Sequence, residues 1–458
     1  KMNRALDELF SDKQLKRDQQ SLTTWGCDWT RSFEVAPSAI VFPESVGEVQ
    51  SLVHWANAEG IPLVPSGGRT GLSGGAVASH GEVVVSFDRM NRILEFNAAD
   101  RLVTCQAGVV TQTLQELAVE KGLFYPVDFA SSGSSQIGGN IATNAGGIKV
   151  IRYGLTRDWV AGLRVVTGSG ELIDCNQGLT KNATGYDLRH LFVASEGTLG
   201  FIVEADMRLT RTPEPQYVMV LGISKFADIL KVLGRFQESI SLSAFEFFSE
   251  LTLQKVLAHR ALQRPLENAV DFYALIEFDE SALDAAGAAF EQVQATGWVN
   301  DGVLSQSQSQ ARALWQLREG ISESIAGFTP YKNDLSVRVS AMPEFVDEVD
   351  RLVRASYPDF EICWYGHIGD GNLHLNILKP DHLDTAAFFA QCHEISPQIF
   401  ELVRLRNGSI SAEHGVGLLK REFLGFTRSE AELAVMRALK KILDPHQIMN
   451  PGKLLPDP

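Results

Sequence analysis

The sequence has few cysteines, no excess of basic residues and no long apolar run. Its five cysteines are an odd number without a CxxC pair, so a disulfide scaffold is not expected and a reducing compartment is favoured. No stretch approaches the length of a membrane-spanning helix. The segment from Lys1 to Arg17 mixes both charge signs and lacks an apolar core, which argues against a signal peptide. We therefore expect a soluble, cytoplasmic protein, with a cleaved organelle presequence as the open alternative.

The charge balance is acidic. The 458 residues include 41 Lys and Arg against 56 Asp and Glu, a net charge of -15 at pH 7. Nucleic-acid binders concentrate Lys and Arg on one face, so nucleic acid is not an expected partner. The hydrophobic share of 45% and the charged share of 21% are ordinary for a globular protein. The chain is longer than one hydrophobic core usually supports, which predicts at least two domains.

Short apolar runs alternate with helical patterns over the first 210 residues. Ser45 is a candidate N-cap, followed by apolar residues at helical spacing up to Ala56. A second helix around Leu114 is predicted to end at Gly122. The turn 168–170 predicts a hairpin between strands 163–166 and 171–173. Further strands are expected at 39–42, 61–64, 83–87, 102–106 and 200–209.

The pattern breaks at 210–215, where Pro213 and Pro215 stand in a polar stretch. Two prolines in such a setting predict a domain boundary. Beyond it, strand-like runs alternate with longer helical patterns, which indicates an α+β domain with an antiparallel sheet. The strand-like runs are 217–221, 244–248 and 272–278, and a helix is expected at 430–443.

Three glycine-rich segments lie at 65–75, 134–147 and 195–200, and the first has five glycines in eleven residues. Glycine lets a backbone approach a ligand closely and turn its N–H groups inward, which makes an anion nest. The first segment has neither the Lys-Ser/Thr of a P-loop nor the spacing of a Rossmann motif. One such loop alone is about as often a flexible surface loop. The three together fit an extended anionic ligand such as a dinucleotide pyrophosphate.

The order and spacing of these segments resemble the vanillyl-alcohol oxidase/p-cresol methylhydroxylase flavoproteins over essentially the whole chain. The resemblance implies an α+β protein with a two-subdomain FAD-binding domain at 1–212. It further implies a substrate- and metal-binding domain at 213–415 and a helical segment at 416–458 that returns to the FAD domain. The loop 65–75 has no histidine or cysteine, so we expect non-covalent FAD. The residues that match the FAD contacts are Pro65, Ser66, Gly67, Gly68, Arg69, Thr70, Gly71, Ser73, Pro126, Asp128, Ser134, Gly138, Gly139, Asn140, Thr143, Asn144, Gly146, Glu196, Gly197, Gly200, Ile202 and Asn450.

Histidines and a carboxylate recur in the C-terminal half. His367 and His374 flank a Gly-Asp-Gly-Asn turn, so a hairpin would place them side by side. His374 and Asn376 are two apart on a strand and share a face. With Glu413, the two histidines make a set of two imidazoles and one carboxylate that suits a divalent metal. The residues alone also fit a plain tight turn, followed by a helix cap at 412–415.

These segments resemble the D-2-hydroxyglutarate dehydrogenases and the related D-lactate and glycolate dehydrogenases. The resemblance implies that His367, His374 and Glu413 bind a divalent ion, usually zinc, and that His414 is the catalytic base. It also implies that the ion binds the substrate's C1 carboxylate and 2-hydroxyl before hydride passes to flavin N5. Electron-transferring flavoprotein or a quinone is the implied acceptor, and a homodimer is left open.

The residues at 315–322 predict a helix with Arg318 and Ser322 four apart on one face. Taken alone, Arg318 would pair with Glu319 or a solvent-exposed carboxylate, and Lys332 would simply be exposed. The resemblance implies that Arg318, Ser322 and Lys332 hold a distal substrate carboxylate, with Asn376 as a further substrate contact. Their joint presence favours D-2-hydroxyglutarate, with D-malate as a second substrate, over D-lactate or glycolate.

Three other functions stay open. A sugar or lactone oxidase of the same fold would lack the metal set and usually binds flavin covalently. An ether-lipid synthase would need a membrane-docking segment, which the sequence does not show. An electron-transfer subunit would carry a flavin without a substrate of its own.

Overall fold

The computed structural model describes residues 5–457, so residues 1–4 and 458, the ends of the expected ranges 1–212 and 416–458, lie outside it. The chain forms two compact units. The first lies within residues 1–147, 154–212 and 413–458, and the second comprises 148–153 and 213–412. The main division thus falls at Thr212, before the two prolines. Two short segments depart from the expected domain ranges. Residues 148–153, expected in the FAD-binding domain, belong to the second unit, and residues 413–415, expected in the substrate-binding domain, belong to the first.

Ion pairs explain the placement of 148–153 in the second unit. The Lys149 ammonium lies 2.7 Å from a carboxylate oxygen of Glu277. The Arg152 guanidinium lies 2.7 Å from a carboxylate oxygen of Asp279. Both carboxylates belong to strand β14 (Phe272–Asp279), so these pairs fix helix α5 (Val150–Tyr153) beside the sheet of the second unit.

The first unit contains a four-stranded sheet in the order β1-β2-β4-β3, and β4 is parallel to both β2 and β3. Helix α2 (Val46–Glu59) begins where the Ser45 hydroxyl accepts the Glu48 N–H, which confirms the predicted N-cap. It ends at Gly60, whose φ of 68° favours glycine. The strands are β1 (Leu15–Lys16), β2 (Ala39–Val41), β3 (Leu63–Ser66) and β4 (Val83–Ser86), and helix α1 is Gln19–Trp25.

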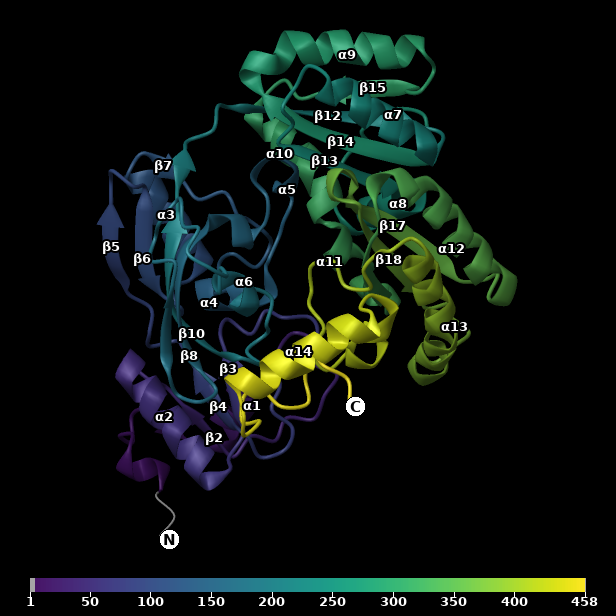
Figure 1. Cartoon of the computed structure of the whole chain (residues 1–458). Coiled ribbons are helices and arrows are strands. Elements are labelled where there is room, and N and C mark those ends of the chain that lie inside the picture. Colours follow the sequence, from purple (N-terminus) through teal and green to yellow (C-terminus); the bar gives the residue numbers. More distant parts are fainter. Residues whose placement is uncertain (1–4, 458) are drawn as a thin grey trace. The chain divides into compact units, whose positions relative to one another are not determined.

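A five-stranded antiparallel sheet, in the order β5-β6-β10-β8-β9, forms the other part of the first unit. The predicted hairpin is present, with Val166 opposite Leu172. Helix α14 (Glu430–Leu443; Figure 1, yellow) lies where a helix was predicted and starts with a capping box at Ser429. Leu433 is its buried residue, and Ile442 is exposed. The other elements are β5 (Ile93–Asn97), β6 (Leu102–Gln106), β8 (Val160–Thr167), β9 (Leu172–Cys175), β10 (Gly200–Arg208), α3 (Thr111–Glu120), α4 (Ile137–Thr143) and α6 (Arg189–Phe192); β7 (Leu123–Phe124) pairs with β11 (Thr210–Arg211).

The second unit is built on a seven-stranded sheet in the order β15-β12-β14-β13-β17-β18-β16. Every neighbouring pair is antiparallel, as predicted. Residues of helices α8, α10 and α11 pack in one apolar cluster on one face. Helices α7 and α13 cover the opposite face, where Phe226 packs on Phe247 and Phe389 on Tyr331. The elements are β12 (Gln216–Ile223), β13 (Ala244–Ser249), β15 (Asp301–Leu304), β16 (Tyr331–Ser336), β17 (Glu361–His367), β18 (Asn372–Leu378), α7 (Phe226–Gln237), α8 (Glu250–His259), α9 (Leu283–Ala295), α10 (Gln308–Glu319), α11 (Ile321–Ile325), α12 (Met342–Ser356) and α13 (Thr385–Leu405).

The single helix predicted for 315–322 is wrong. Helix α10 ends at Glu319 and α11 begins at Ile321, with Gly320 between them. A Cβ at Gly320 would lie 2.7 Å from the Gln316 carbonyl oxygen and 2.9 Å from Arg260 Nε. Glycine therefore permits the close approach of the Arg260 side chain at this break.

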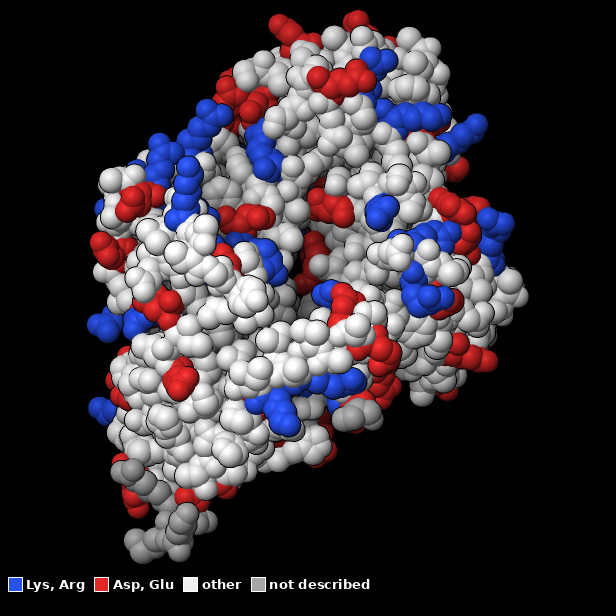
Figure 2. Space-filling model, viewed as in Figure 1, with Lys and Arg blue, Asp and Glu red and all other residues white. Residues whose placement is uncertain are grey.

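The surface seen in Figure 2 carries acidic and basic side chains interspersed with uncharged residues. No helix among residues 5–457 combines the length and hydropathy that crossing a bilayer requires.

Candidate active site

Strand register gathers polar side chains on one face of the seven-stranded sheet. Residues directly opposite one another on paired antiparallel strands project to the same face. Alternate residues along a strand share that face as well, so Tyr365 and His367 point the same way. The pairs are Glu246 with His367, Tyr365 with His374, His374 with Asp334, and Asn376 with Lys332. We call this set the polar face; it is the side on which α8, α10 and α11 pack.

The predicted hairpin between the two histidines is confirmed. His367 ends β17 and His374 lies in β18, and between them a 3-10 turn ends at Gly371, whose φ is 70°. The two imidazole centroids are 5.5 Å apart. Single ligand atoms of His367, His374 and Glu413 lie within 4.8 Å of one another. This donor set fits a divalent ion such as zinc.

Glu413 directly follows Ala412, the last residue of the second unit. The Ala412 N–H donates to the Asp334 carbonyl oxygen over 3.1 Å. This backbone bond holds Ala412 beside β16. The residues 412–414 form a bend rather than the alternative helix cap.

Each of the two imidazoles has a buried carboxylate behind its Nδ1. Glu246 Oε2 lies 2.7 Å from His367 Nδ1. Asp334 Oδ1 lies 3.8 Å from His374 Nδ1 and accepts the Asn372 side-chain amide over 2.9 Å. Both carboxylates have side chains that are 1% exposed. Carboxylates in this position orient the imidazoles of metal sites.

Arg318 is buried at the end of α10. Its Nη2 lies 3.3 Å from Glu246 Oε1, and its Cζ lies 4.8 Å from the centroid of the Tyr365 ring. The partner is thus Glu246, a buried carboxylate of strand β13, and not a solvent-exposed carboxylate. Arg318 Nε is buried without a hydrogen-bond partner among the described residues.

The other predicted substrate residues are divided between buried and exposed positions. Asn376 is buried on the polar face, opposite Lys332. Lys332 itself is exposed, and Ser322, in α11, is exposed as well. The structure therefore brings Arg318, Asn376 and Lys332 to the polar face, and Lys332 and Ser322 are exposed to solvent.

In the first unit, close contacts bring the three glycine-rich segments together. A Cβ at Gly68 would lie 2.2 Å from the Ser134 carbonyl oxygen. A Cβ at Gly197 would lie 2.6 Å from Pro65 Cγ. The φ of Gly197, 72°, also favours glycine. The Asn450 amide donates to the carbonyl oxygens of Gly75 and Glu196 over 2.9 and 2.8 Å. The C-terminal segment thus joins the first and third segments.

Buried polar atoms without hydrogen-bond partners lie in this glycine-rich region. They are Ser66 Oγ, Arg69 Nη1 and Gln136 Oε1 among the described residues, and Arg69 Nη1 lies 3.8 Å from Asp88 Oδ2 in an ion pair. Arg69 has a φ of 58°, and its guanidinium lies 5.3 Å from the centroid of the Trp25 ring. Unsatisfied buried groups of this kind are expected where a polar ligand binds. The region therefore fits the predicted FAD.

Several predicted FAD contacts use their side chains within the protein. Asn140 donates to Thr111 Oγ1 over 2.7 Å, and Asn144 Oδ1 accepts the Arg157 N–H over 3.0 Å. Thr143 donates to the Gly139 carbonyl oxygen. These bonds hold α4, so only the remaining donors and acceptors of these residues are available to a ligand. The other predicted contacts, Thr70, Gly71, Pro126, Asp128, Gly138, Gly146, Gly200 and Ile202, lie in the same unit.

Two more predicted FAD contacts hold the segment that carries His414. The Glu196 carboxylate accepts the N–H groups of Val416 and Gly417 over 3.1 and 2.9 Å. Burial raises the pKa of the Glu196 carboxyl to about 7, although the hydrogen bonds from these two N–H groups lower it in part. The Ser73 hydroxyl lies 2.8 Å from the His414 carbonyl oxygen and donates to it. Both side chains fix the backbone that follows Glu413.

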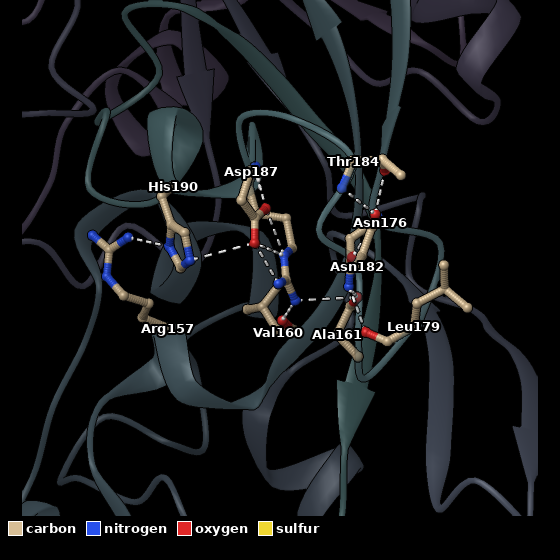
Figure 3. A network of polar contacts seen from close by, with 10 residues as sticks. Arg157, Val160, Ala161, Asn176, Leu179, Asn182, Thr184, Asp187 and His190 are labelled. Atoms are coloured by element: carbon tan, nitrogen blue, oxygen red, sulfur yellow. Dashed lines mark hydrogen bonds and ion pairs between the residues drawn. The ribbon is translucent and has the colours of Figure 1, made fainter.

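A second network of carboxylate, arginine and histidine lies in the first unit (Figure 3). An Asp187 oxygen lies 2.6 Å from Arg189 Nη2, and His190 Nε2 lies 3.6 Å from the same carboxylate. Arg189 also donates to the Val160 carbonyl oxygen over 2.7 Å. These bonds fix the exposed loop 179–188 to the start of β8.

Comparisons with known proteins agree on the fold. Residues 37–176 match a family described as FAD binding domain, and residues 212–454 match one described as FAD linked oxidases, C-terminal domain. A substrate-bound p-cresol methylhydroxylase shares the fold, with a TM-score of 0.76 at 16% identity over 98% of this chain and 95% of that one. An alkyldihydroxyacetonephosphate synthase has a TM-score of 0.72 at 20% identity over 97% and 83%. The protein is therefore an FAD-linked flavoenzyme, and the predicted fold class is confirmed.

Curated relatives narrow the class. The D-2-hydroxyglutarate dehydrogenase of Stutzerimonas stutzeri (strain A1501) is 58% identical over 98% of this chain and 97% of that protein. The mitochondrial D-2-hydroxyglutarate dehydrogenase of Bos taurus is 35% identical over 96% and 80%. This chain belongs to the family of D-2-hydroxyglutarate dehydrogenases.

Glu246, Asp334 and Tyr365 were not predicted as site residues. Glu246 had a local signal, because it is the one charged residue in the otherwise apolar run 244–248 of a predicted strand. A lone charge in a buried strand indicates a specific partner. Asp334 and Tyr365 had no such signal, since their positions depend on which strands pair.

Proposed function

We propose that this protein oxidises D-2-hydroxyglutarate to the corresponding 2-oxo acid, and D-malate as a second substrate. One observation carries the proposal: a buried arginine with an unpaired donor lies on the same sheet face as two imidazoles of a candidate metal set. That arrangement suits a substrate with a 2-hydroxy acid at one end and a carboxylate at the other. The family membership supports the same substrate.

The cofactor would be FAD, held without a covalent bond by the three glycine-rich segments. Bound there, it would accept the hydride from the substrate's Cα. A divalent ion, most simply zinc, would be held by His367, His374 and Glu413. It would supply Lewis acidity at the substrate hydroxyl.

The chain's own residues would orient the substrate and move one proton. The His414 imidazole takes the proton of the 2-hydroxyl as general base. Arg318 binds the distal carboxylate through its planar fork, which suits carboxylate better than a point charge does. Lys332 and Ser322 complete the distal contacts, and Asn376 hydrogen-bonds the substrate from the polar face.

D-Lactate and glycolate, the alternative substrates expected from the sequence, are not supported by the relatives, which are named D-2-hydroxyglutarate dehydrogenase. Neither has a distal carboxylate, so neither would use Arg318 in this way. The electrons would leave to electron-transferring flavoprotein or a quinone. We propose a cytoplasmic location; the Bos taurus relative is named mitochondrial.

The experiment that tests the proposal is rapid-mixing flavin reduction by D-2-hydroxyglutarate without oxygen. His414→Ala should lower the rate constant by about 10²–10⁴-fold, the usual loss for a general base. Substrate binding should persist, because the carboxylate contacts remain. His382→Ala, at an exposed histidine of the second unit, is the control and should reduce at the wild-type rate. A His414→Ala rate equal to that of the control would refute the assignment.

A further inference from the structure

Glu246 stands between two groups to which the proposed function gives different tasks. It lies in β13, opposite His367 of β17, and its side chain is buried. One carboxylate oxygen, Oε2, meets His367 Nδ1 at 2.7 Å. The other, Oε1, lies 3.3 Å from Arg318 Nη2. A single buried carboxylate thus contacts both a candidate metal ligand and the candidate anchor of the distal carboxylate.

The contact with His367 fixes which ring nitrogen carries the proton. An ionised carboxylate only accepts hydrogen bonds, so His367 Nδ1 must donate. In the neutral imidazole, the lone pair is then on Nε2, and Nε2 is the nitrogen left to bind a metal. A carboxylate behind a metal-binding imidazole also raises the basicity of that ligand.

The contact with Arg318 is an ion pair. Glu246 Oε1 lies 3.3 Å from Arg318 Nη2 without forming a hydrogen bond among the described residues, and the Tyr365 ring lies 4.8 Å from Arg318 Cζ. With these two contacts made, Nε stays buried without a partner among the described residues. The arginine is therefore held at one edge while another of its donors is free for a ligand.

We infer that Glu246 is a positioning residue that couples metal binding at His367 to selection of a dicarboxylate substrate through Arg318. The inference rests on the proposed function of those two residues. Asp334 offers the internal contrast. It lies behind His374, the other imidazole of the candidate metal set, and accepts the side-chain amide of Asn372. Loss of Asp334 should therefore affect the metal alone.

Three variants separate the two tasks. Glu246→Gln keeps an acceptor for His367 but presents no charge to Arg318, so it should lower zinc affinity less than Glu246→Ala does and still lose the substrate preference. Glu246→Ala removes both contacts. It should lower zinc affinity by about 10–100-fold, as removal of such a supporting group usually does, and also lower the preference for D-2-hydroxyglutarate over D-lactate. Asp334→Ala should lower zinc affinity and leave the preference unchanged.

Glu277→Ala is the matched control. Glu277 is a buried carboxylate of β14 on the same face of the same sheet, and it accepts a hydrogen bond from Trp315 of α10 over 2.9 Å. Loss of Glu277 should alter neither zinc affinity nor the preference for D-2-hydroxyglutarate over D-lactate. The measurements are zinc affinity, from competition with a chromophoric chelator, and the ratio of kcat/KM for the two substrates. Equal effects of Glu246→Ala and Glu277→Ala on both would overturn the coupling.

A third readout separates failure of the inference from failure of the proposed function. If the wild type bound no zinc or did not oxidise either substrate, the proposed function would fail first. Imidazole NMR of the ¹⁵N-histidine-labelled, metal-free protein still tests Glu246. A His367 Nδ1–H signal that is present in the wild type and lost in Glu246→Ala supports the arrangement. A signal absent from the wild type, or unchanged in the variant, overturns it.

Discussion

The protein contains two networks built from the same three kinds of side chain. In the second unit, Glu246 meets Arg318 and His367; in the first, Asp187 meets Arg189 and His190. Glu246, Arg318 and His367 come from three different elements, β13, α10 and β17. Asp187, Arg189 and His190 lie within four residues of one another in the sequence. Carboxylate, arginine and histidine side chains are 1%, 8% and 7% exposed in the buried trio, against 35%, 14% and 47% in the other.

Burial decides what each network can do. An exposed ion pair contributes about 0–1 kcal/mol, because water solvates its members almost as well apart as together. A buried pair gains little net stability, since desolvation opposes attraction, yet loss of one partner leaves an uncompensated charge. The exposed trio therefore serves to fix a loop locally. The buried trio is not explained by stability alone, which supports a role in the chemistry of the polar face.

Metal removal should produce the largest contrast between the two regions. Dialysis against EDTA is expected to abolish turnover, because the imidazoles of the polar face would lose their ion. FAD should stay bound, since its contacts lie in the first unit. Zinc, cobalt or manganese should restore turnover. Full activity in a preparation shown by elemental analysis to be metal-free would contradict the metal set.

Arg318→Ala should have the second largest effect. It leaves Glu246 buried without its cation, which costs about 3–5 kcal/mol of stability. It should also raise KM for D-2-hydroxyglutarate by an amount equivalent to about 2–5 kcal/mol, the usual effect of losing a buried charged partner, with much less effect on D-lactate. Arg318→Lys is the matched variant: it keeps a charge beside Glu246 but loses the fork. Steady-state kinetics and thermal unfolding separate the two effects. Equal impairment of both substrates would favour a D-lactate or glycolate dehydrogenase.

Asp187→Asn should give the smallest effect, about 1 kcal/mol or less of stability at neutral pH. The hydrogen bond from Arg189 lowers the pKa of Asp187 below its ordinary value. The stabilisation from ionised Asp187 is therefore present above that ordinary value and is lost as pH falls through the lowered one. Denaturant unfolding should show the variant and the wild type converging in acid. A destabilisation as large as that of Arg318→Ala would break the contrast between the networks.

Local patterns predicted much of the fold. The strand Leu102–Gln106, the helix Glu430–Leu443, the N-cap at Ser45 and the hairpin between the two histidines all follow from nearby residues. Other features depended on tertiary contacts. Helix α4 was not anticipated, because Gly138 and Gly139 have low helix propensity. The break at Gly320 depends on Arg260, which is distant in sequence.

The site was predictable only in part for a similar reason. His367 and His374 are near in sequence, and the turn between them indicates a hairpin. Glu246 meets His367 across 121 positions of the chain. Only the pairing of β13 with β17 brings the two together, and no local pattern encodes that register.

The most direct test of the central claim is anaerobic flavin reduction, followed by the loss of oxidised-flavin absorbance, with a panel of 2-hydroxy acids. The account predicts rapid and complete bleaching by D-2-hydroxyglutarate, slower bleaching by D-lactate and none by L-2-hydroxyglutarate. It also predicts that EDTA treatment prevents bleaching and that zinc restores it. Bleaching by D-lactate as fast as by D-2-hydroxyglutarate would contradict the distal-carboxylate site, and a flavin that no hydroxy acid reduces would contradict the proposed function itself.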